Sequence, residues 1–401
     1  DRERFEEFAK RVGLRMPNGR TASTPEEVRE AVQEIGYPVL IRPSYVLGGR
    51  GMEILSNNRQ LDAYMEEAYL SPERPLLVDE YLGNAMELDV DAVCDGTEVL
   101  IGAIMEHLEE AGIHSGDSTC FIPPQNISKK ILAQVEDWTK KIGIQLGIKG
   151  CFNIQYAIRG ETLYVLEVNP RGSRTFPFVA KATGVPLARI AARLTLGEKL
   201  ADLDFPEPQS EAVCVKAPVF PFIKLRGLDP APGPEMKSTG EVMGSHKRAA
   251  AAYLKARLAT ELPVPIEGGV YITVKNADKH DVIPLAQELE EMGFTIYATR
   301  GTAHVLRDSG GVDVQTCYRI TEGLTPDALD LMRQGKIHLI INTPRNTGGA
   351  VLDGNMMRRL AVELNIPFVT TMAGARMEVQ AIAEAKEGIP EPRLLDIAIL
   401  N

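Results

Sequence analysis

The segment Pro263-Val264-Pro265-Ile266-Glu267-Gly268-Gly269 divides the chain, because prolines and glycines in this density interrupt helices and strands. After it, short apolar runs typical of strands alternate with segments of helical spacing. The expected strands are 270–274, 294–298, 337–341 and 367–370, and the expected helices are 278–292, 325–332 and 353–364, followed by a last helix. This alternation predicts a doubly wound parallel sheet, since parallel strands are joined by crossover helices. We therefore expect a separate domain over residues 265–401.

The composition of the 401 residues is that of a globular protein, with 44% hydrophobic and 25% charged residues. A net charge of -11 argues against nucleic acid or an anionic membrane as the main partner. Since no apolar run reaches the roughly 18–20 residues of a membrane span, we expect no membrane partner and a cytoplasmic protein. The five cysteines form no C-x-x-C pair and fit reduced thiols. The start at Asp1, without Met or a signal peptide, predicts a piece of a longer protein.

A glycine-rich loop, Gly48-Gly49-Arg50-Gly51, lies between two expected strands, 39–41 and 52–55. Because a strand follows it, the loop is neither a Walker loop nor a dinucleotide fingerprint, which both lead into a helix. The backbone N–H groups of the glycines can approach a polyphosphate, with the loop closing over it as a lid. Arg42 and Arg50 can clamp phosphoryl oxygens. A flexible hairpin with solvated arginines explains the loop equally well.

A polar cluster ends an expected hairpin made of strands 151–158 and 163–168. Glu167 and Asn169 are two residues apart, so their side chains point to one face, and Gln155 lies on the partner strand. Carboxylate and amide oxygens suit Mg²⁺, which completes its shell with ATP phosphates. Arg171 would add charge for a phosphoryl group in transfer. The alternative is an ordinary exposed strand end.

Two further segments are candidates for a nucleotide site. His114 lies among hydroxyls and a carboxylate in the glycine-flanked segment 112–118, where it is either a site residue or a structural histidine. Asp79 and Glu80 follow a short strand, and Glu87 opens an acid–apolar alternation that predicts a strand with one buried face. These carboxylates suit adenine and ribose groups, but a solvated loop explains them as well.

Together these segments resemble a known family, the large subunit of carbamoyl-phosphate synthetase, in its C-terminal half. The resemblance covers essentially the whole chain and rests on four segments: residues 42–50, 114–118, 167–171 and 238–244. Ser-Tyr-Val-Leu-Gly-Gly-Arg and His-Ser-Gly-Asp-Ser in particular resemble the half that phosphorylates carbamate. The resemblance implies α/β and α+β architecture: an ATP-grasp domain over 1–204 with a lid at about 36–80, a connection at 205–264, and a methylglyoxal-synthase-like allosteric domain over 265–401.

The activity that the resemblance implies is a ligase reaction, in which ATP phosphorylates carbamate to carbamoyl phosphate for pyrimidine or arginine biosynthesis. The implied cofactors are ATP, about two Mg²⁺ or Mn²⁺ ions, and K⁺ as a further ion. By the same resemblance, Arg42 and Arg50 would contact ATP phosphates. Glu80 and Leu82 would line the adenine pocket, and Glu87 would bind ribose. The residues that would border the nucleotide are Gly112, Ile113, His114 and Ser115. Gln155, Glu167 and Asn169 would bind metal, and Asn169 and Arg171 would face carbamate and the γ-phosphate.

The resemblance also implies an effector pocket in the last domain, where Thr299-Arg300-Gly301-Thr302 follows a strand. Its expected residues are Lys279, Thr299, Thr302, Arg319, Asn342 and Thr343. Ordinary loops of an α/β sheet would also gather such residues. A regulatory role is favoured because we find no clear catalytic carboxylate for methylglyoxal synthase chemistry. Ala217 follows Val215-Lys216 where some members have a Glu that helps bind ornithine, so we expect no strong activation by ornithine and favour a uridine nucleotide or phosphoribosyl pyrophosphate.

The implied partners are the N-terminal synthetase half and the glutaminase small subunit. The subdomain that usually precedes an ATP-grasp fold is missing from the sequence, which leaves an alternative open: a truncated, inactive module that binds nucleotide and effector. A different ATP-grasp ligase, such as a carboxylase, is a third hypothesis. The domain after Gly269 argues against it.

Overall fold

The computed structural model describes residues 2–44, 51–68, 75–208, 210, 212–222, 229–343 and 349–388. The chain divides into two compact units, of which the first contains residues 1–211 and 232–237 and the second contains residues 212–231 and 238–394. Most of the segment expected to be a connection therefore belongs to the second unit. Arg50 and the two preceding glycines of the glycine-rich loop lie outside the described residues.

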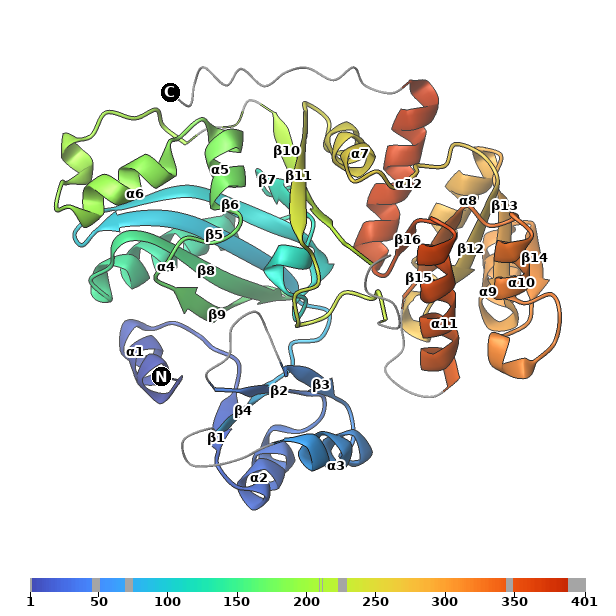
Figure 1. Ribbon diagram of the computed structural model, residues 1–401, viewed down its shortest axis with the longest axis horizontal. Coiled ribbons are helices and arrows are strands. Elements are labelled where there is room, and N and C mark those ends of the chain that lie inside the picture. Colours follow the sequence, from blue (N-terminus) through green and yellow to red (C-terminus); the bar gives the residue numbers. More distant parts are fainter. Residues whose placement is uncertain are drawn as a thin grey trace. The chain divides into compact units, whose positions relative to one another are not determined.

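The first unit begins with helix α1 (Arg2–Val12) and a small antiparallel sheet of order β1-β4-β2-β3 (Figure 1). The other elements are β1 (Gly19–Ala22), α2 (Pro25–Ile35), β2 (Val39–Pro43), β3 (Glu53–Leu55), α3 (Asn58–Glu67) and β4 (Leu76–Glu80). As the sequence pattern indicates, Pro25 lies in the first turn of α2 and Thr24 Oγ1 accepts from the N–H of Glu27. Because β1 pairs with β4 from Gly19 onward, this sheet starts before the predicted lid boundary at about residue 36.

A larger antiparallel sheet of order β7-β6-β5-β8-β9 forms the centre of the first unit. Its elements are β5 (Met86–Asp95), β6 (Val99–Glu110), the short 3₁₀ helix η1 (Ser115–Asp117), β7 (Cys120–Ile122), α4 (Lys129–Gln145), β8 (Lys149–Arg159), β9 (Thr162–Asn169), α5 (Phe176–Thr183), α6 (Leu187–Thr195) and η2 (Leu200–Asp202). The alternation of β5 sorts its side chains: Leu88, Val90 and Ala92 join a core with Trp138 of α4. The opposite face, which carries the carboxylates of β5, is turned toward α5 and α6 (Figure 1).

The second unit contains an antiparallel pair and a parallel sheet of order β14-β13-β12-β15-β16. Its elements are β10 (Val213–Val219), β11 (Gly240–His246), α7 (Ala249–Ala259), β12 (Gly269–Thr273), η3 (Asn276–Asp278), α8 (Ile283–Glu291), β13 (Thr295–Thr299), α9 (Arg300–Gly310), β14 (Val314–Cys317), η4 (Ile320–Glu322), α10 (Ala328–Arg333), β15 (Leu339–Asn342), α11 (Gly349–Glu363), β16 (Phe368–Val369) and α12 (Met372–Glu387). Residues of α8, α9 and α12 share one core with the sheet, and residues of α10 and α11 share another, so the sheet is covered on both faces. The doubly wound prediction is confirmed.

The sequence prediction for the parallel sheet was incomplete at α9 and β14. Thr299-Arg300-Gly301-Thr302 was expected to be a loop after a strand, but Thr299 ends β13 and the next residue already begins α9. Helix α9 buries only Thr302, Ala303 and Leu306. This apolar face is too short to reveal the helix by periodicity.

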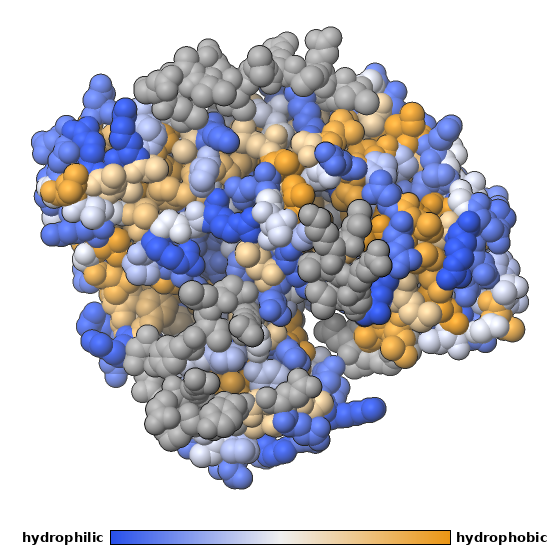
Figure 2. Space-filling view, viewed as in Figure 1, coloured by the Kyte–Doolittle hydropathy of each residue, from blue (hydrophilic) through white to orange (hydrophobic). Residues whose placement is uncertain are grey.

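The surface mixes hydrophilic and hydrophobic residues on the face drawn in Figure 2. In the part of the chain that the structure describes, none of the helices is long and apolar enough to cross a membrane.

Candidate functional site

Two polar rows cross the large sheet of the first unit. Residues directly opposite one another in antiparallel strands project from the same face. Asp89 of β5 is opposite Gln155 of β8, which is opposite Glu167 of β9. The next row on this face consists of Asp91, Asn153 and Asn169. The hairpin thus brings together the three residues that the sequence singled out for metal.

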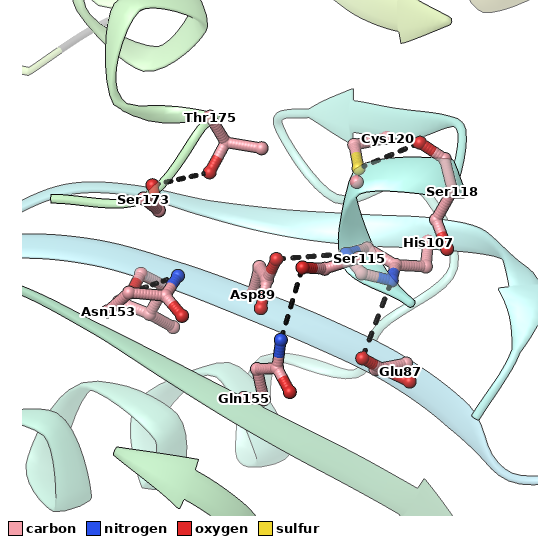
Figure 3. Close-up of polar contacts among 12 residues, drawn as sticks. Glu87, Asp89, His107, Ser115, Ser118, Cys120, Asn153, Gln155, Ser173 and Thr175 are labelled. Atoms are coloured by element: carbon pink, nitrogen blue, oxygen red, sulfur yellow. Dashed lines mark hydrogen bonds and ion pairs between the residues drawn. The ribbon is translucent and has the colours of Figure 1, made fainter. Parts of the chain in front are cut away.

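Gln155 and Glu167 are both tied to neighbouring predicted residues. Gln155 Nε2 donates to Ser115 Oγ at 3.1 Å, so its carboxamide oxygen is the atom left for a cation (Figure 3). Glu167 Oε2 lies 3.6 Å from Arg42 Nη1, while Arg42 Nε lies 3.5 Å from Asp79 Oδ2. Arg42 therefore reaches from the small sheet to the metal-candidate row.

Asp89 of this row belongs to a buried group of two carboxylates and an imidazole (Figure 3). His107 Nδ1 is 3.8 Å from Glu87 Oε1, and its Nε2 is 3.4 Å from Asp89 Oδ2. Burial raises the pKa of Glu87 to about 8, although the nearby His107 opposes the shift. Burial favours the neutral form of His107, but its contacts with Cys120 and Asp89 outweigh this and raise the pKa of the ring. Glu87, predicted for ribose, is thus only 3% exposed and packed against His107.

The segment that contains Gly112, Ile113, His114 and Ser115 connects β6 to β7. The N–H of Gly112 donates to Glu87 Oε2 at 3.4 Å, which links two predicted nucleotide residues. His114 Nδ1 accepts from the N–H of Gly116 at 3.0 Å, and burial lowers the pKa of the imidazole. The N–H of His114 donates to the carbonyl of Gly233 at 2.9 Å. His114 therefore has a local structural role, and its contact with the nucleotide stays a prediction.

Of the predicted adenine residues, Glu80 is the last residue of β4 and Leu82 lies two residues further along the chain. Leu82 is buried in a small apolar cluster with Ala85, Ala111, Ala157 and Tyr164. Glu80 accepts from Arg159 Nη1 at 2.8 Å and from Asn18 Nδ2 at 3.2 Å. In this structure the Glu80 carboxylate therefore accepts hydrogen bonds from two protein side chains.

Arg171 follows β9 and is exposed. Its N–H donates to the carbonyl of Asn169 at 2.8 Å, and its Nη1 donates to the carbonyl of Gly172. The two predicted catalytic residues, Asn169 and Arg171, therefore lie two residues apart in one tight turn beside the metal-candidate row.

One cavity of the second unit gathers the predicted effector residues. Lys279, Thr299, Thr302, Arg319, Asn342 and Thr343 all line it, together with Tyr271, Asp353 and Gly354. It lies at the carboxyl ends of the parallel strands, where ligands bind in doubly wound sheets. Thr299 is the N-cap of α9 and makes no side-chain capping bond.

Asp89, Asp91 and His107 were not among the site residues predicted from the sequence. The spacing of Glu87, Asp89 and Asp91 at alternate positions was a signal, because it places three carboxylates on one strand face. His107 gave no such signal, since only the pairing of β5 with β6 brings it to these carboxylates.

Comparison with known proteins agrees with this arrangement. Residues 1–203 match the family model described as the carbamoyl-phosphate synthase L chain, ATP binding domain. Residues 281–370 match the MGS-like domain. The chain is 50% identical over 400 residues to the carbamoyl phosphate synthase large chain, C-terminal section, of Methanocaldococcus jannaschii, covering 97% of this chain and 64% of that protein. It is 48% identical to the large chain of Methanothermobacter thermautotrophicus, covering 99% of this chain and 38% of that protein.

Solved structures with similar backbones are more distant in sequence. The biotin carboxylase domain of the Hydrogenobacter thermophilus 2-oxoglutarate carboxylase, in complex with MgADP and bicarbonate, has a TM-score of 0.53 at 19% identity over 64% of each chain. Carboxyaminoimidazole ribonucleotide synthase of Aspergillus clavatus, complexed with ATP, has a TM-score of 0.52 at 18% identity, covering 64% of this chain and 70% of that one. These likenesses show the ATP-grasp fold, and a five-stranded MGS-like domain follows it. The chain belongs to the carbamoyl-phosphate synthase large-chain family.

Proposed function

We propose that this chain uses ATP to phosphorylate carbamate, which yields carbamoyl phosphate and ADP. The chain spans between about a third and two thirds of the length of the relatives described above. We therefore infer its activity from its own site and not from the names of these longer proteins. The observation that supports the proposal most is the row formed by Gln155 and Glu167, which adjoins both Arg42 and the His114–Ser115 segment.

The donor set formed by this row and by Asn169 of the next row fits Mg²⁺ or Mn²⁺. Glu167 offers a carboxylate, and Gln155 and Asn169 offer amide oxygens on the same face. Among the described residues no group of three or more His, Cys, Asp or Glu could hold a metal alone, which suits a cation that takes its other ligands from ATP and water. When bound, the cation would neutralise charge on the transferring phosphoryl group. K⁺ remains a further ion to which we assign no ligands.

The protein's own residues would act mainly by positioning. Arg42 would hold ATP phosphates, with Arg50 as a second phosphate contact, and Glu80, Leu82 and Glu87 would hold the nucleoside. Asn169 and Arg171 would orient carbamate so that its oxygen attacks the γ-phosphorus in line while ADP leaves. Alignment of the reacting atoms and neutralisation of charge account for most catalysis of phosphoryl transfer.

The cavity of the second unit supports a regulatory role. Lys279 and Arg319 supply positive charge, and the threonines and Asn342 supply hydrogen bonds, so we propose that it binds a phosphorylated effector. In the cell the chain would work with an N-terminal synthetase half and a glutaminase subunit, in pyrimidine or arginine biosynthesis.

The forward reaction separates this proposal from its alternatives. The 401-residue chain is given Mg-ATP with freshly dissolved ammonium carbamate, or with bicarbonate alone, and ADP and carbamoyl phosphate are measured. We expect ADP to form with carbamate and in equal amount with carbamoyl phosphate. ADP formation that needs only bicarbonate would favour a carboxylase-type ligase. No ADP, together with measurable binding of Mg-ADP, would favour an inactive nucleotide-binding module.

A further inference from the structure

Asp91 of β5 is a fully buried carboxylate that accepts hydrogen bonds from three side chains. Ser173 Oγ lies 2.7 Å from Asp91 Oδ1 and 2.8 Å from Oδ2, and Thr175 Oγ1 donates to Oδ2 at 2.7 Å. Asn153 Nδ2 donates to Oδ1 at 3.0 Å. Figure 3 shows Asn153, Ser173 and Thr175 around this part of the sheet. Asp91 thus joins the sheet to the segment after β9.

The three donors explain why a carboxylate stands at this position. Burial raises the pKa of Asp91 to about 6, while the bonds from Thr175, Ser173 and Asn153 oppose the shift because they favour the ionised form. An ionised carboxylate only accepts hydrogen bonds, whereas an amide would present an NH₂ group to one of the donors. A buried carboxylate is costly unless it is satisfied in this way.

The segment that Asp91 holds contains the predicted catalytic Arg171. At one end, Asn169 is fixed by the pairing of β9 with β8. At the other end, Ser173 and Thr175 are fixed by Asp91. Thr175 is the N-cap residue of α5; its side chain makes no capping bond, and its hydroxyl donates to the carboxylate of Asp91. The segment is therefore anchored on both sides of Arg171.

Asp91 also lies next to the candidate site. It lies in the same row as Asn153 and Asn169, next to the row of Asp89, Gln155 and Glu167. A movement of the 170–175 segment would shift Arg171 relative to these side chains. The fold of the sheet would persist, because the pairing of β5, β8 and β9 does not depend on the three hydroxyl and amide bonds to Asp91.

We propose that Asp91 is a positioning residue, which holds the 170–175 segment so that Arg171 and Asn169 keep their alignment with Gln155 and Glu167. This inference rests on the proposed phosphoryl transfer. It assigns no contact with substrate to Asp91. Its role is to support transfer more than nucleotide binding.

The test uses the 401-residue chain and measures ATP formation from Mg-ADP and carbamoyl phosphate. We expect Asp91→Asn to lower kcat about 100-fold, the size of effect that a misplacement of about 1 Å produces, and to leave the KM for Mg-ADP nearly unchanged. The exposed Asp137→Asn, on α4 in an ion pair with Lys141, is the matched control and should behave as the wild type. An unchanged kcat in Asp91→Asn would overturn the inference.

A second pair of variants decides the case if Asp91→Asn does not fold. Thr175→Ser keeps the hydroxyl that donates to Asp91, and Thr175→Val removes it at similar size. We expect Thr175→Ser to retain most of kcat and Thr175→Val to lose it, again with little change in KM. Equal kcat values for the two variants would contradict the role of Asp91.

Tryptic cleavage separates this inference from the proposed function. Arg171 and Arg174 are exposed in the segment, so trypsin can cut after either once the segment loosens. If the wild type makes no ATP, the proposed function fails. The rates of tryptic cleavage still test whether Asp91 anchors the segment. Faster cleavage at these sites in Thr175→Val than in Thr175→Ser would support the anchor, and equal rates would overturn it.

Discussion

Glu87, Asp89 and Asp91 bring three carboxylates to one buried face of a single strand. Burial disfavours the charged form of a carboxylate, and neighbouring carboxylates disfavour it further. Two kinds of contact offset the cost of burying these carboxylates. His107 lies between Glu87 and Asp89, and hydroxyl and amide donors surround Asp91. The pKa of Glu87 is nevertheless about 8 and that of Asp91 about 6.

The raised pKa of Glu87 predicts a pH-dependent stability. Its carboxyl group is ionised above about pH 4.5 in the unfolded chain but only above about pH 8 in the folded protein. The folded state therefore binds an additional proton between these values, and its contribution to stability is lost as the pH rises through this window. Because Glu87→Gln stays neutral, its unfolding free energy should rise relative to wild type, by an amount on the order of a few kcal/mol between about pH 5 and 8.

Urea unfolding at several pH values, followed by circular dichroism, measures this difference. Glu161→Gln, at the exposed turn between β8 and β9, is the control and should follow the wild type at each pH. A difference between Glu87→Gln and wild type that stays constant from pH 5 to 8 would contradict the buried, protonated state of Glu87.

At the residue scale, the sequence predicted the candidate metal residues because they lie close together along one hairpin. Glu167 and Asn169 are two residues apart at the end of one strand, and Gln155 is on its hairpin partner, so local pairing is enough to bring them together. His107 and Asp91 take part through contacts that depend on the order of strands in the sheet. Spacing along the chain carries no information on that order.

Among the elements, the segment between β6 and η1 requires a glycine at one position. Gly112 has a φ of +100°, and a Cβ at this position would lie 2.8 Å from the ring of Tyr81. Tyr81 is itself held by a hydrogen bond from its hydroxyl to the carbonyl of Ala111 at 3.1 Å. The glycine therefore lets the predicted nucleotide segment pass closely over an aromatic ring.

We predict that Gly112→Ala destabilises the first unit by about 1–3 kcal/mol and weakens Mg-ADP binding, because the segment must move away from Tyr81. Gly160→Ala is the control, since Gly160 also has a positive φ, +62°, but has nothing within 4 Å of an added Cβ. Urea unfolding and titration calorimetry with Mg-ADP provide the two readouts. Equal Mg-ADP affinities in the two variants would show that the close packing at Gly112 does not support the nucleotide site.

The elements also show which patterns predict structure well. The long hairpin of β8 and β9 and the alternation of β5 were readable, because each repeats one period over many residues. Helix α9 was missed because a glycine and polar residues occupy its first turns. Strand β14 was missed because only Val314 and Cys317 of its four residues are buried.

For the whole molecule, the main organisational feature is its division into two compact units that carry separate candidate sites. The Pro-rich segment before Gly269 suggested a boundary, and the parallel sheet does begin there. The compact unit nevertheless begins earlier, because β10 and β11 pair with each other and α7 packs beside them. Long-range pairing of this kind has no signature in a local stretch of sequence.

We predict that inorganic phosphate stabilises the second unit through the Lys279 cavity. A ligand at about 100 times its dissociation constant stabilises a fold by about 2.7 kcal/mol. Differential scanning calorimetry with phosphate, against chloride at equal ionic strength, measures the shift in unfolding temperature. Lys279→Gln should lose most of it, whereas Lys336→Gln, at an exposed position, should retain it. Equal shifts in both variants would contradict phosphate binding in this cavity.

The central claim is that the row of Gln155 and Glu167 supports transfer of a phosphoryl group to and from carbamate. Its most direct test is ATP formation from carbamoyl phosphate and Mg-ADP by the 401-residue chain, compared with Glu167→Gln. We predict that the wild type makes ATP and that the variant, with an unchanged circular dichroism spectrum, makes essentially none, because it lacks the carboxylate of Glu167. ATP formation by Glu167→Gln at the wild-type rate would contradict the account.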